Sequence, residues 1–475
     1  KGLLYNSAIF FEDGNILHKV NKRLLPTYDV FDERRYFKAG VENRAFPYKG
    51  YKIGLTVCED VWNDKEIFKK KRLYKTDPVA LTIEDGADLI INISASPFYK
   101  GKNKFRSEML GAIAKKHKTP MVYANQVGGN DSILFDGISS GFDKNGDIIA
   151  RASDFKEDLV VFNLETLKKD IHPIAESDDE SILKALVMGT RDYVSKCGFS
   201  KAVIGLSGGI DSALTAYIAV KALGPENVLT VFMPSEYTSE DNYEDTEQFA
   251  ENFGVELINV PIGGIFKEFL KYFSGSNKNQ SRDAQPGVTE QNIQARIRGT
   301  ILMGFSNMNG CLLLSTGNKS ELGVGYCTLY GDMNGGLAVI SDVPKTRVYS
   351  IARYINRGKE YIPSRIIEKE PTAELKPDQK DQDDLPPYKM LDPVLKGYIE
   401  DSRSVEELVG AGFEKKLVED IVARVDRNEY KRHQAAPGLK VTSKAFGCGR
   451  RYPIAQRYTM RPLQNAPFRP ISASG

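Results

Sequence analysis

The chain has 475 residues, of which 41% are hydrophobic and 27% are charged, and its formal net charge is +2. This length predicts two or three domains with buried cores, and the near balance of charge argues against a nucleic-acid partner. The sequence has no apolar run of about 18 residues and no signal-peptide pattern, so we expect a cytoplasmic protein without a membrane partner.

The amino-terminal third alternates short strand signals with helical ones. Strands are predicted at 51–57, 87–93 and 121–125, and a helix at 105–116. A polar, acidic stretch follows residue 163 and precedes a helical pattern that starts at residue 182. We therefore expect a first domain at 1–163, a linker at 164–180 and a second domain at 181–475.

One cysteine in this first part is a candidate nucleophile. Cys58 comes directly after the strand at 51–57 and is followed by Glu59 and Asp60. Those two carboxylates would raise the pKa of the thiol, so a reactive Cys58 requires a nearby cation, which Lys22 can supply, and a base. The residue alone also fits a buried, unreactive cysteine.

The other cysteines give no sign of a disulfide framework or a zinc site. All five are widely spaced and form no Cys-x-x-Cys pair: Cys58, Cys197, Cys311, Cys327 and Cys448. A Cys-His catalytic pair is a weaker alternative, because no histidine lies in a catalytic motif: His18, His117, His172 and His433.

The second part opens on a glycine turn between a strand and a helix. Ser207-Gly208-Gly209-Ile210-Asp211-Ser212 follows the apolar run 202–206 and leads into a helical pattern at 213–222. Paired glycines and a helix N-terminus can hold an anion, and the best candidate is a polyphosphate. No Gly-Lys-Ser/Thr follows, which excludes a Walker A loop, and Asp211 would repel phosphate unless Mg²⁺ stood between them. An ordinary glycine-rich turn is the alternative.

Further strands and helices alternate after this turn, which predicts a doubly wound parallel sheet. Strands are expected at 228–232, 255–260 and 311–314, and helices at 241–252 and 290–305. Ser207 and Thr316 each follow such a strand, where the ligand crevice of this sheet type lies. The polar stretches 274–287 and 376–387 are expected to be mobile loops, either solvated connectors or lids over a nucleotide.

The glycine turn resembles the pyrophosphate loop of the N-type ATP pyrophosphatases. Within that group the chain resembles the NAD synthetases, through these motifs: 233–239 (MPSEYTS), 289–298 (TEQNIQARIR), 315–321 (STGNKSE), 325–332 (GYCTLYGD), 343–346 (VPKT) and 369–375 (KEPTAEL). The resemblance runs from about residue 181 to beyond residue 440. A GMP synthetase or a tRNA-modifying enzyme is the nearer rival, but the first uses a glutaminase with another motif and the second usually has a basic surface or sulfur-handling cysteines.

This resemblance implies ATP-dependent adenylation of deamido-NAD(+) and its amidation to NAD(+), with Mg²⁺ held by Asp211 and Glu321. It places ATP at Gly205, Leu206, Ser207, Gly208, Gly209, Ile210, Asp211, Ser212, Thr316 and Lys345. It places deamido-NAD(+) at Asn292, Glu321, Tyr326, Cys327, Thr328, Leu329, Asp332 and Lys431. No tightly bound organic cofactor is expected. The chain is expected to form a homo-oligomer.

The first part resembles the glutaminase domain that is fused to some NAD synthetases, a nitrilase-type αββα sandwich. The resemblance rests on Lys22 and Cys58 together with the runs 31–37 and 92–98. It implies Cys58 as nucleophile, Lys22 as its cation and Glu33 as a supporting carboxylate. Around the glutamine it places Tyr28, Glu59 and Trp62. The implied function is NAD(+) synthesis with ammonia from glutamine.

One departure from this pattern concerns the general base. The family's base is a glutamate several tens of residues before the lysine, whereas only residues 1–21 precede Lys22. Glu12 is too close, and its setting predicts the tip of a β-hairpin. We therefore expect that the sequence lacks its natural N-terminus and that the first domain is partial. A catalytically inactive scaffold is the alternative for this domain.

Overall fold

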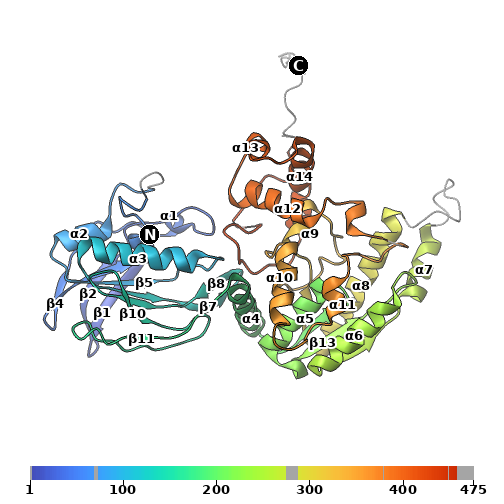
Figure 1. Ribbon diagram of the computed structural model, residues 1–475, viewed down its shortest axis with the longest axis horizontal. Helices are drawn as coiled ribbons and strands as arrows, with labels where there is room; N and C mark the ends of the chain where they lie inside the picture. Colours follow the sequence, from blue (N-terminus) through green and yellow to red (C-terminus); the bar gives the residue numbers. More distant parts are fainter. Residues whose placement is uncertain (1–2, 69–72, 274–286, 378, 448, 457–475) are drawn as a thin grey trace, which may run out of the picture.

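The computed structural model describes residues 3–68, 73–273, 287–377, 379–447 and 449–456. Two halves lie side by side, and helix α4 (Asp178–Lys196) stands where they meet (Figure 1). We call residues 3–171 the amino-terminal half and residues 178–456 the carboxyl-terminal half. None of the described helices combines the length and the apolar character that a membrane span requires.

The amino-terminal half is built on a seven-stranded mixed sheet in the order β11-β10-β9-β6-β5-β4-β3. Its strands are β3 (Phe46–Tyr48), β4 (Tyr51–Val57), β5 (Leu89–Ser94), β6 (Met121–Asn125), β9 (Ser140–Phe142), β10 (Ile148–Arg151) and β11 (Asp170–Ile171). Strands β4, β5 and β6 are parallel, as their alternation with helices predicts.

Helices cover one face of this sheet and a β-ribbon covers the other. Helices α2 (Pro78–Glu84) and α3 (Lys102–His117) pack on one face, and the antiparallel ribbon β1 (Ser7–Glu12) and β2 (Asn15–Asn21) packs on the other. These are a helical layer and two β layers of the nitrilase-like sandwich. The predicted hairpin is confirmed, and Glu12 at its end accepts hydrogen bonds from Tyr48 (2.8 Å) and Lys49 (2.7 Å).

The carboxyl-terminal half contains the predicted doubly wound sheet. Its order is β14-β13-β12-β15-β16, all parallel: β12 (Ala202–Gly205), β13 (Val228–Phe232), β14 (Glu256–Asn259), β15 (Leu312–Ser315) and β16 (Leu337–Ala338). Helices α5 (Ile210–Leu223), α6 (Glu240–Phe253) and α10 (Lys345–Ile355) pack on one face, and α7 (Gly263–Phe273) and α8 (Val288–Asn309) on the other. The strand order reverses between β12 and β15, so a ligand crevice is expected there.

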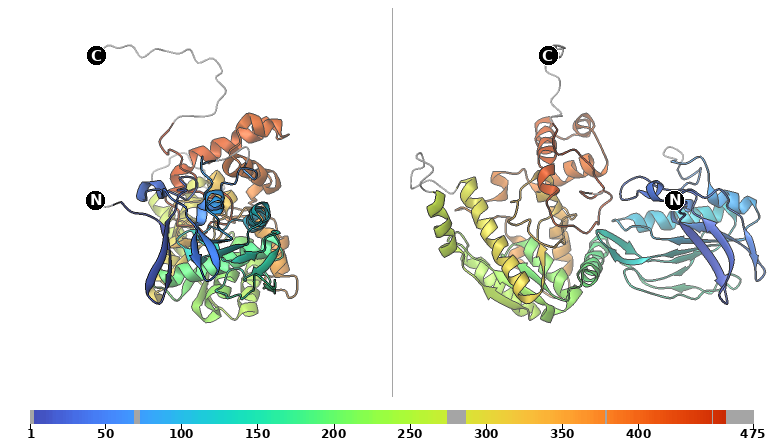
Figure 2. Two further views of the ribbon diagram at one scale, coloured as in Figure 1. Left: turned by 90° about the vertical axis from the view of Figure 1, so that its left-hand side faces the viewer. Right: turned by 180° about the vertical axis from the view of Figure 1, so that it is seen from behind.

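A small helical group completes this half. Helices α12 (Tyr388–Leu395), α13 (Val405–Gly410) and α14 (Lys415–Arg427) share an apolar core and pack against α9 (Lys319–Val324). They rise from the carboxyl-terminal half on its side nearest to the other half (Figures 1 and 2). The short helices α1 (Glu33–Tyr36), α11 (Ser364–Glu368) and α15 (Glu429–Arg432) lie in connecting segments.

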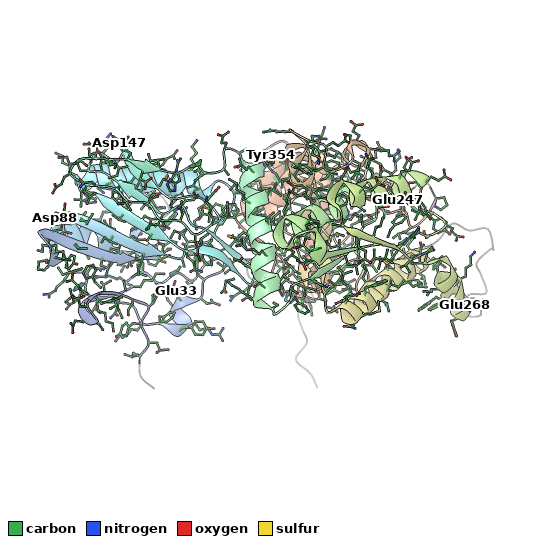
Figure 3. All side chains as sticks on the ribbon, turned by 90° about the horizontal axis from the view of Figure 1, so that it is seen from below. Glu33, Asp88, Asp147, Glu247, Glu268 and Tyr354 are labelled. Carbon is green, nitrogen blue, oxygen red and sulfur yellow. The ribbon has the colours of Figure 1, made fainter. Side chains whose placement is uncertain are left out.

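The two halves are joined by close packing along α4. This helix crosses between them in Figure 3, where Glu33 is labelled on one side and Glu247 on the other. It packs against the hairpin β7 (Val127–Asn130) and β8 (Ile133–Asp136), and Asp192 accepts a hydrogen bond from the backbone N–H of Gly129 at 2.8 Å. Part of the predicted linker has regular secondary structure, because strand β11 within it pairs in parallel with β10.

Candidate active sites

The glycine turn forms an open loop between β12 and α5, at the carboxyl edge of the parallel sheet. Gly208 has a φ of +79°, a conformation that side chains other than glycine rarely adopt. Ser212 Oγ accepts from the backbone N–H of Ser207 at 3.2 Å and donates to Gly209 O at 2.9 Å, which ties the loop to the first turn of α5. The loop therefore has the strand, turn and helix N-terminus that the sequence predicts for an anion site.

Gly208→Ala is expected to weaken ATP binding about tenfold or more, a cost of about 1.4 kcal/mol. A Cβ at this position would lie 2.6 Å from Asn242 Oδ1, and a left-handed backbone costs a further 1–2 kcal/mol, roughly. Gly198→Ala is the matched control, because Gly198 has a φ of +82° with open space around it and lies outside the loop. Calorimetric titration with ATP should separate the two, and equal affinities would contradict the proposed loop geometry.

A buried group of charges lies beside this loop. Lys345 Nζ, from the start of α10, contacts the carboxylates of Asp211 in α5 and Glu321 in α9, the latter at 3.1 Å. The second oxygen of Asp211 accepts from Asn318 Nδ2 at 3.0 Å. Asp381 adds a third carboxylate that faces the group and accepts from Tyr388 Oη at 2.8 Å. The structure thus brings together three residues that are far apart in the sequence and that we predicted as ATP or metal ligands.

This group contains more acidic than basic side chains. Burial, together with the charges of Asp211 and Asp381, raises the pKa of Glu321 above its ordinary value, although Lys345 opposes the shift. The two carboxylates raise the pKa of Lys345, so this lysine keeps its charge. Three carboxylates against one ammonium leave two negative charges in excess when all are ionised. That excess equals the charge of a divalent cation, and carboxylate oxygens are suitable ligands for Mg²⁺.

Among the residues that the structure describes, no three metal-ligating side chains converge as they would in an all-protein metal site. Mg²⁺ is commonly held by one or two carboxylates together with substrate phosphates and water. Asp211 and Glu321 beside an anion loop fit that arrangement.

A cavity of about 300 Å³ opens at this edge of the sheet, and most of the predicted nucleotide residues line it. From the predictions for ATP and metal these are Gly205, Leu206, Ser207, Gly208, Gly209, Ile210, Asp211, Ser212, Thr316, Glu321 and Lys345. From the predictions for deamido-NAD(+) they are Tyr326, Thr328 and Asp332. Burial raises the pKa of Asp332 to about 6, against the hydrogen bond that its carboxylate accepts from Thr328 N–H.

Four residues predicted for deamido-NAD(+), namely Asn292, Cys327, Leu329 and Lys431, are not among the described residues that line the cavity, and each takes part in a contact that holds the loop 325–332. Lys431 Nζ donates to the carbonyls of Gly325 and Cys327, each at 2.7 Å. Asn292 Oδ1 accepts from Thr328 Oγ1 at 2.8 Å, and Leu329 O accepts from Arg296 Nε at 3.2 Å. Their direct contact with the dinucleotide stays a prediction.

The cavity also contains residues to which the sequence assigned no role. Arg298 is half-buried, desolvation lowers its pKa to about 10, and it donates to Met233 O at 3.0 Å. Lys369 Nζ and Glu374 pair at 3.0 Å, and Lys369 Nζ also donates to Asn242 Oδ1 at 2.9 Å. The motif at 369–375 contains Lys369 and Glu374 and could have identified both as residues of the site. Arg298 lies in the motif at 289–298, but its type gave no indication that it faces the cavity.

The expectation of a solvated loop at 376–387 is wrong for three of its described residues, of which Gln379 is 6% exposed. Asp381 and Leu385 are each 4% exposed, and Asp381 lines the cavity. A short 3₁₀ turn, Asp381–Asp383, orders this part of the segment. The other predicted loop, 274–287, falls outside the described residues except for Gly287.

A second site lies in the amino-terminal half, around Cys58. This residue directly follows β4 and begins a 3₁₀ turn, Cys58–Val61, with a φ of +44°. A left-handed backbone at a residue other than glycine stores strain of about 1–3 kcal/mol and is enriched at active sites. Burial raises the pKa of the Cys58 thiol, while the charges of Lys22 and Lys102 lower it. The cation that a reactive cysteine requires is therefore present.

Lys22 is held at this site by two carboxylates. Its Nζ is buried and donates to Glu33 Oε1 at 2.5 Å. Asp60 accepts from the backbone N–H groups of Arg23 (3.0 Å) and Leu24 (2.9 Å), which anchors the segment of Lys22 to the turn that carries Cys58. The predicted trio of Cys58, Lys22 and Glu33 is thus brought together by the fold.

The predicted glutamine residues surround the same turn. Tyr28 Oη donates to Glu59 Oε1 at 2.9 Å, and Tyr74 Oη donates to the same atom at 3.1 Å. Burial raises the pKa of Glu59 to about 6. Lys102, from the start of α3, lies 5.3 Å from the ring of Trp62, and burial lowers its pKa to about 8. The sequence missed Lys102, because a lysine at the start of a helix carries no local sign of its neighbours.

Comparisons with known proteins match two different families to the amino-terminal and carboxyl-terminal parts of the chain. Residues 182–435 match the family model described as NAD synthase, and residues 1–167 match the one described as carbon-nitrogen hydrolase. The glutamine-dependent NAD(+) synthetase of Synechocystis sp. is 48% identical over 460 residues, which cover 96% of this chain and 82% of that protein. The protein of the same name from Thermotoga maritima is 42% identical over 492 residues, or 96% of this chain and 83% of that one.

A solved structure extends the likeness to three dimensions. The glutamine-dependent NAD+ synthetase from Acinetobacter baumannii, in complex with adenosine diphosphate, is 42% identical, with a TM-score of 0.73 over 95% of this chain and 82% of that one. The chain belongs to the family of glutamine-dependent NAD(+) synthetases.

Proposed function

We propose the following roles for the two sites in glutamine-dependent NAD(+) synthesis. The protein is a carbon–nitrogen ligase of this family. The observation that carries the assignment of roles is that one chain holds a Cys58–Lys22–Glu33 site and, separately, an acidic cavity with an anion loop. The overall reaction converts ATP, deamido-NAD(+) and glutamine to NAD(+), AMP, pyrophosphate and glutamate.

In the cavity, the loop from Ser207 to Ser212 holds the phosphates of ATP. Mg²⁺, held by Asp211 and Glu321, neutralises phosphate charge when bound. The carboxylate of deamido-NAD(+) attacks the α-phosphorus, the bond to the β-phosphate breaks, and pyrophosphate leaves. Lys345 Nζ lies beside Asp211 and Glu321, where its charge neutralises phosphate. Ammonia then attacks the acyl carbon, and AMP leaves with the former carboxylate oxygen.

At the second site, the thiolate of Cys58 attacks the side-chain amide of glutamine. Lys22 stabilises the thiolate and the tetrahedral oxyanion, and the backbone N–H of Glu59 donates to that oxyanion. The C–N bond breaks and ammonia leaves with a proton, and water then hydrolyses the thioester to glutamate and restores the thiol of Cys58. Ammonium in water is not nucleophilic, so release inside the protein supplies the reactive form.

The affinity for glutamine should depend on pH through Lys102. Its pKa of about 8 means that the ammonium loses its charge as the pH rises above this value. If this charge attracts the α-carboxylate of glutamine, binding is strongest below pH 8 and weakens about tenfold per pH unit above it. Calorimetry with the Cys58→Ala variant, which cannot turn over, measures this. Lys102→Arg should remove the weakening, and identical profiles for both proteins would contradict the role.

The products formed from ATP test the synthetase assignment. With deamido-NAD(+) and ammonium, mass spectrometry should find AMP, pyrophosphate and NAD(+) in equal amounts. ADP and phosphate as the products would contradict attack at the α-phosphorus and the place of Ser207 to Ser212 in the reaction.

We also propose a cytoplasmic location and a homo-oligomer. The described cysteines Cys58, Cys197, Cys311 and Cys327 are free thiols, as in a reducing compartment. One face of α7 leaves large apolar side chains exposed, which suits a contact between copies: Ile265, Phe269, Tyr272 and Phe273. Sedimentation of the protein and of a Phe269→Glu variant tests the second point.

A further inference from the structure

One segment near the C-terminus runs between the two sites. We call residues 438–444 the bridging segment. On one side, Asp342 accepts hydrogen bonds from the backbone N–H groups of Val441 (2.8 Å) and Thr442 (2.7 Å). Asp342 also pairs with Lys319 at 3.0 Å, and Lys319 lies two residues before Glu321 in the chain. On the other side, the segment contacts three separate parts of the amino-terminal half. The carboxyl-terminal half thus reaches across to the neighbourhood of Cys58.

Lys440 carries the contacts to the amino-terminal half. Its backbone N–H donates to Ser132 O at 2.8 Å, and its side chain is 2% exposed. Its Nζ lies 3.3 Å from Asp29 Oδ2 and 5.4 Å from the ring of Tyr99, and it donates to Thr442 O at 2.9 Å. A buried ammonium is costly without a carboxylate, so Asp29 is the group that stabilises this charge.

Asp29 is joined directly to a residue of the glutamine site. Its φ is +51°, and the preceding residue, Tyr28, donates to Glu59 beside Cys58. The other oxygen of Asp29, Oδ1, is buried and has no hydrogen-bond partner among the described residues. A Cβ at Gly449 would lie only 2.8 Å from that oxygen. The carboxylate is therefore confined from two sides by the carboxyl-terminal half.

We infer that Lys440, through Asp29, is a positioning residue for the hydrolysis of glutamine: a lysine of the carboxyl-terminal half holds the loop that places Tyr28 and Glu59 at Cys58. The inference rests on the proposed glutaminase function of Cys58. Breaking the ion pair releases the Tyr28 loop, while the ATP cavity keeps its own charge group. Glutamine binding should suffer, and ammonia-dependent synthesis should not.

Asp29→Asn is the sharpest test. Asparagine tolerates a left-handed backbone and keeps the size of the side chain, so only the charge of the pair is lost. In the full-length protein we expect the KM for glutamine, measured by glutamate release, to rise about tenfold or more, because small displacements at a reacting centre have effects of that size. NAD(+) formation with ammonium should stay within about twofold of the unmodified protein.

Two further variants distinguish positioning from a general role at the interface. Lys440→Met should raise the same KM, and the double variant should be no worse than the more affected single one, because both changes break one contact. Lys184→Met is the matched control, since Lys184 pairs with Asp154 of the other half at 3.3 Å but does not touch the Tyr28 loop. It should leave the glutamine KM unchanged.

The outcomes are decisive. An unchanged glutamine KM in Asp29→Asn overturns the inference while leaving the proposed function in place. If ammonia-dependent synthesis falls as much as glutamine-dependent synthesis, the inference is also overturned, because the ion pair then stabilises the whole fold. If the unmodified protein releases no glutamate from glutamine, the proposed function of Cys58 fails, and the inference fails with it.

Discussion

Asp211→Asn is expected to lower NAD(+) formation about 10²–10³-fold with either glutamine or ammonium as nitrogen source, the size of effect seen when one electrostatic contact to a reacting group is lost. Asparagine keeps the shape of the side chain but removes the charge that Mg²⁺ and Lys345 require. Both nitrogen sources depend on the same adenylation step, so both rates should fall together. Steady-state rates with each source measure the effect.

The fold should survive this substitution, because Asp211 lies at the edge of the cavity and not in the apolar core. Asp420→Asn is a suitable control, since Asp420 pairs with Arg424 on the surface of α14 and touches neither site. Thermal unfolding of both variants should match that of the unmodified protein. Near-normal synthesis from ammonium by Asp211→Asn at ordinary Mg²⁺ would contradict its role as a metal ligand.

Cys58→Ala is expected to separate the two activities. The change removes the sulfur nucleophile with little loss of volume, and Cys58 lies in a different half from the anion loop. Glutamine-dependent synthesis should fall about 10³-fold or more, as when a nucleophile is deleted from other hydrolases. Ammonia-dependent synthesis should be largely unchanged. Parallel assays with saturating glutamine and with ammonium at mildly alkaline pH measure both rates.

Cys197→Ala provides the comparison, because Cys197 is an exposed thiol at the end of α4 and lies in neither site. It should retain both activities. If Cys58 were only a structural residue, its replacement would lower both activities together through a small loss of packing. Equal loss in both assays, or none in either, would exclude Cys58 as the nucleophile.

The sequence predicted those parts of the sites that depend on local structure. The strand, glycine turn and helix around Ser207 to Ser212 are continuous in the chain, so their pattern can be read directly, and β12 and α5 confirm it. The doubly wound parallel sheet follows from the same alternation of strands and helices, whereas the order of its strands and the short strand β16 were not predicted. Cys58 and Lys22 were identified through the family resemblance, and the structure places them in one site.

The residues that were missed depend on long-range contacts. Lys102 approaches Cys58 and Trp62 only when α3 packs in the folded chain, and Lys440 approaches Asp29 only when the bridging segment reaches the amino-terminal half. The polar neighbours of Asp381 predict a solvated loop. The burial of Asp381 is stabilised by Tyr388 and by the charge of Lys345, which are distant partners that no local pattern contains.

The most direct test of the account follows the nitrogen atom. The full-length protein is supplied with ATP, deamido-NAD(+), glutamine carrying a heavy-nitrogen label in its side-chain amide, and an equal concentration of unlabelled ammonium. Mass spectrometry then measures the label in NAD(+). The account predicts that most of the NAD(+) carries one labelled nitrogen in its carboxamide and that Cys58→Ala yields only unlabelled NAD(+). Unlabelled NAD(+) from the unmodified protein, or labelled NAD(+) from Cys58→Ala, would contradict it.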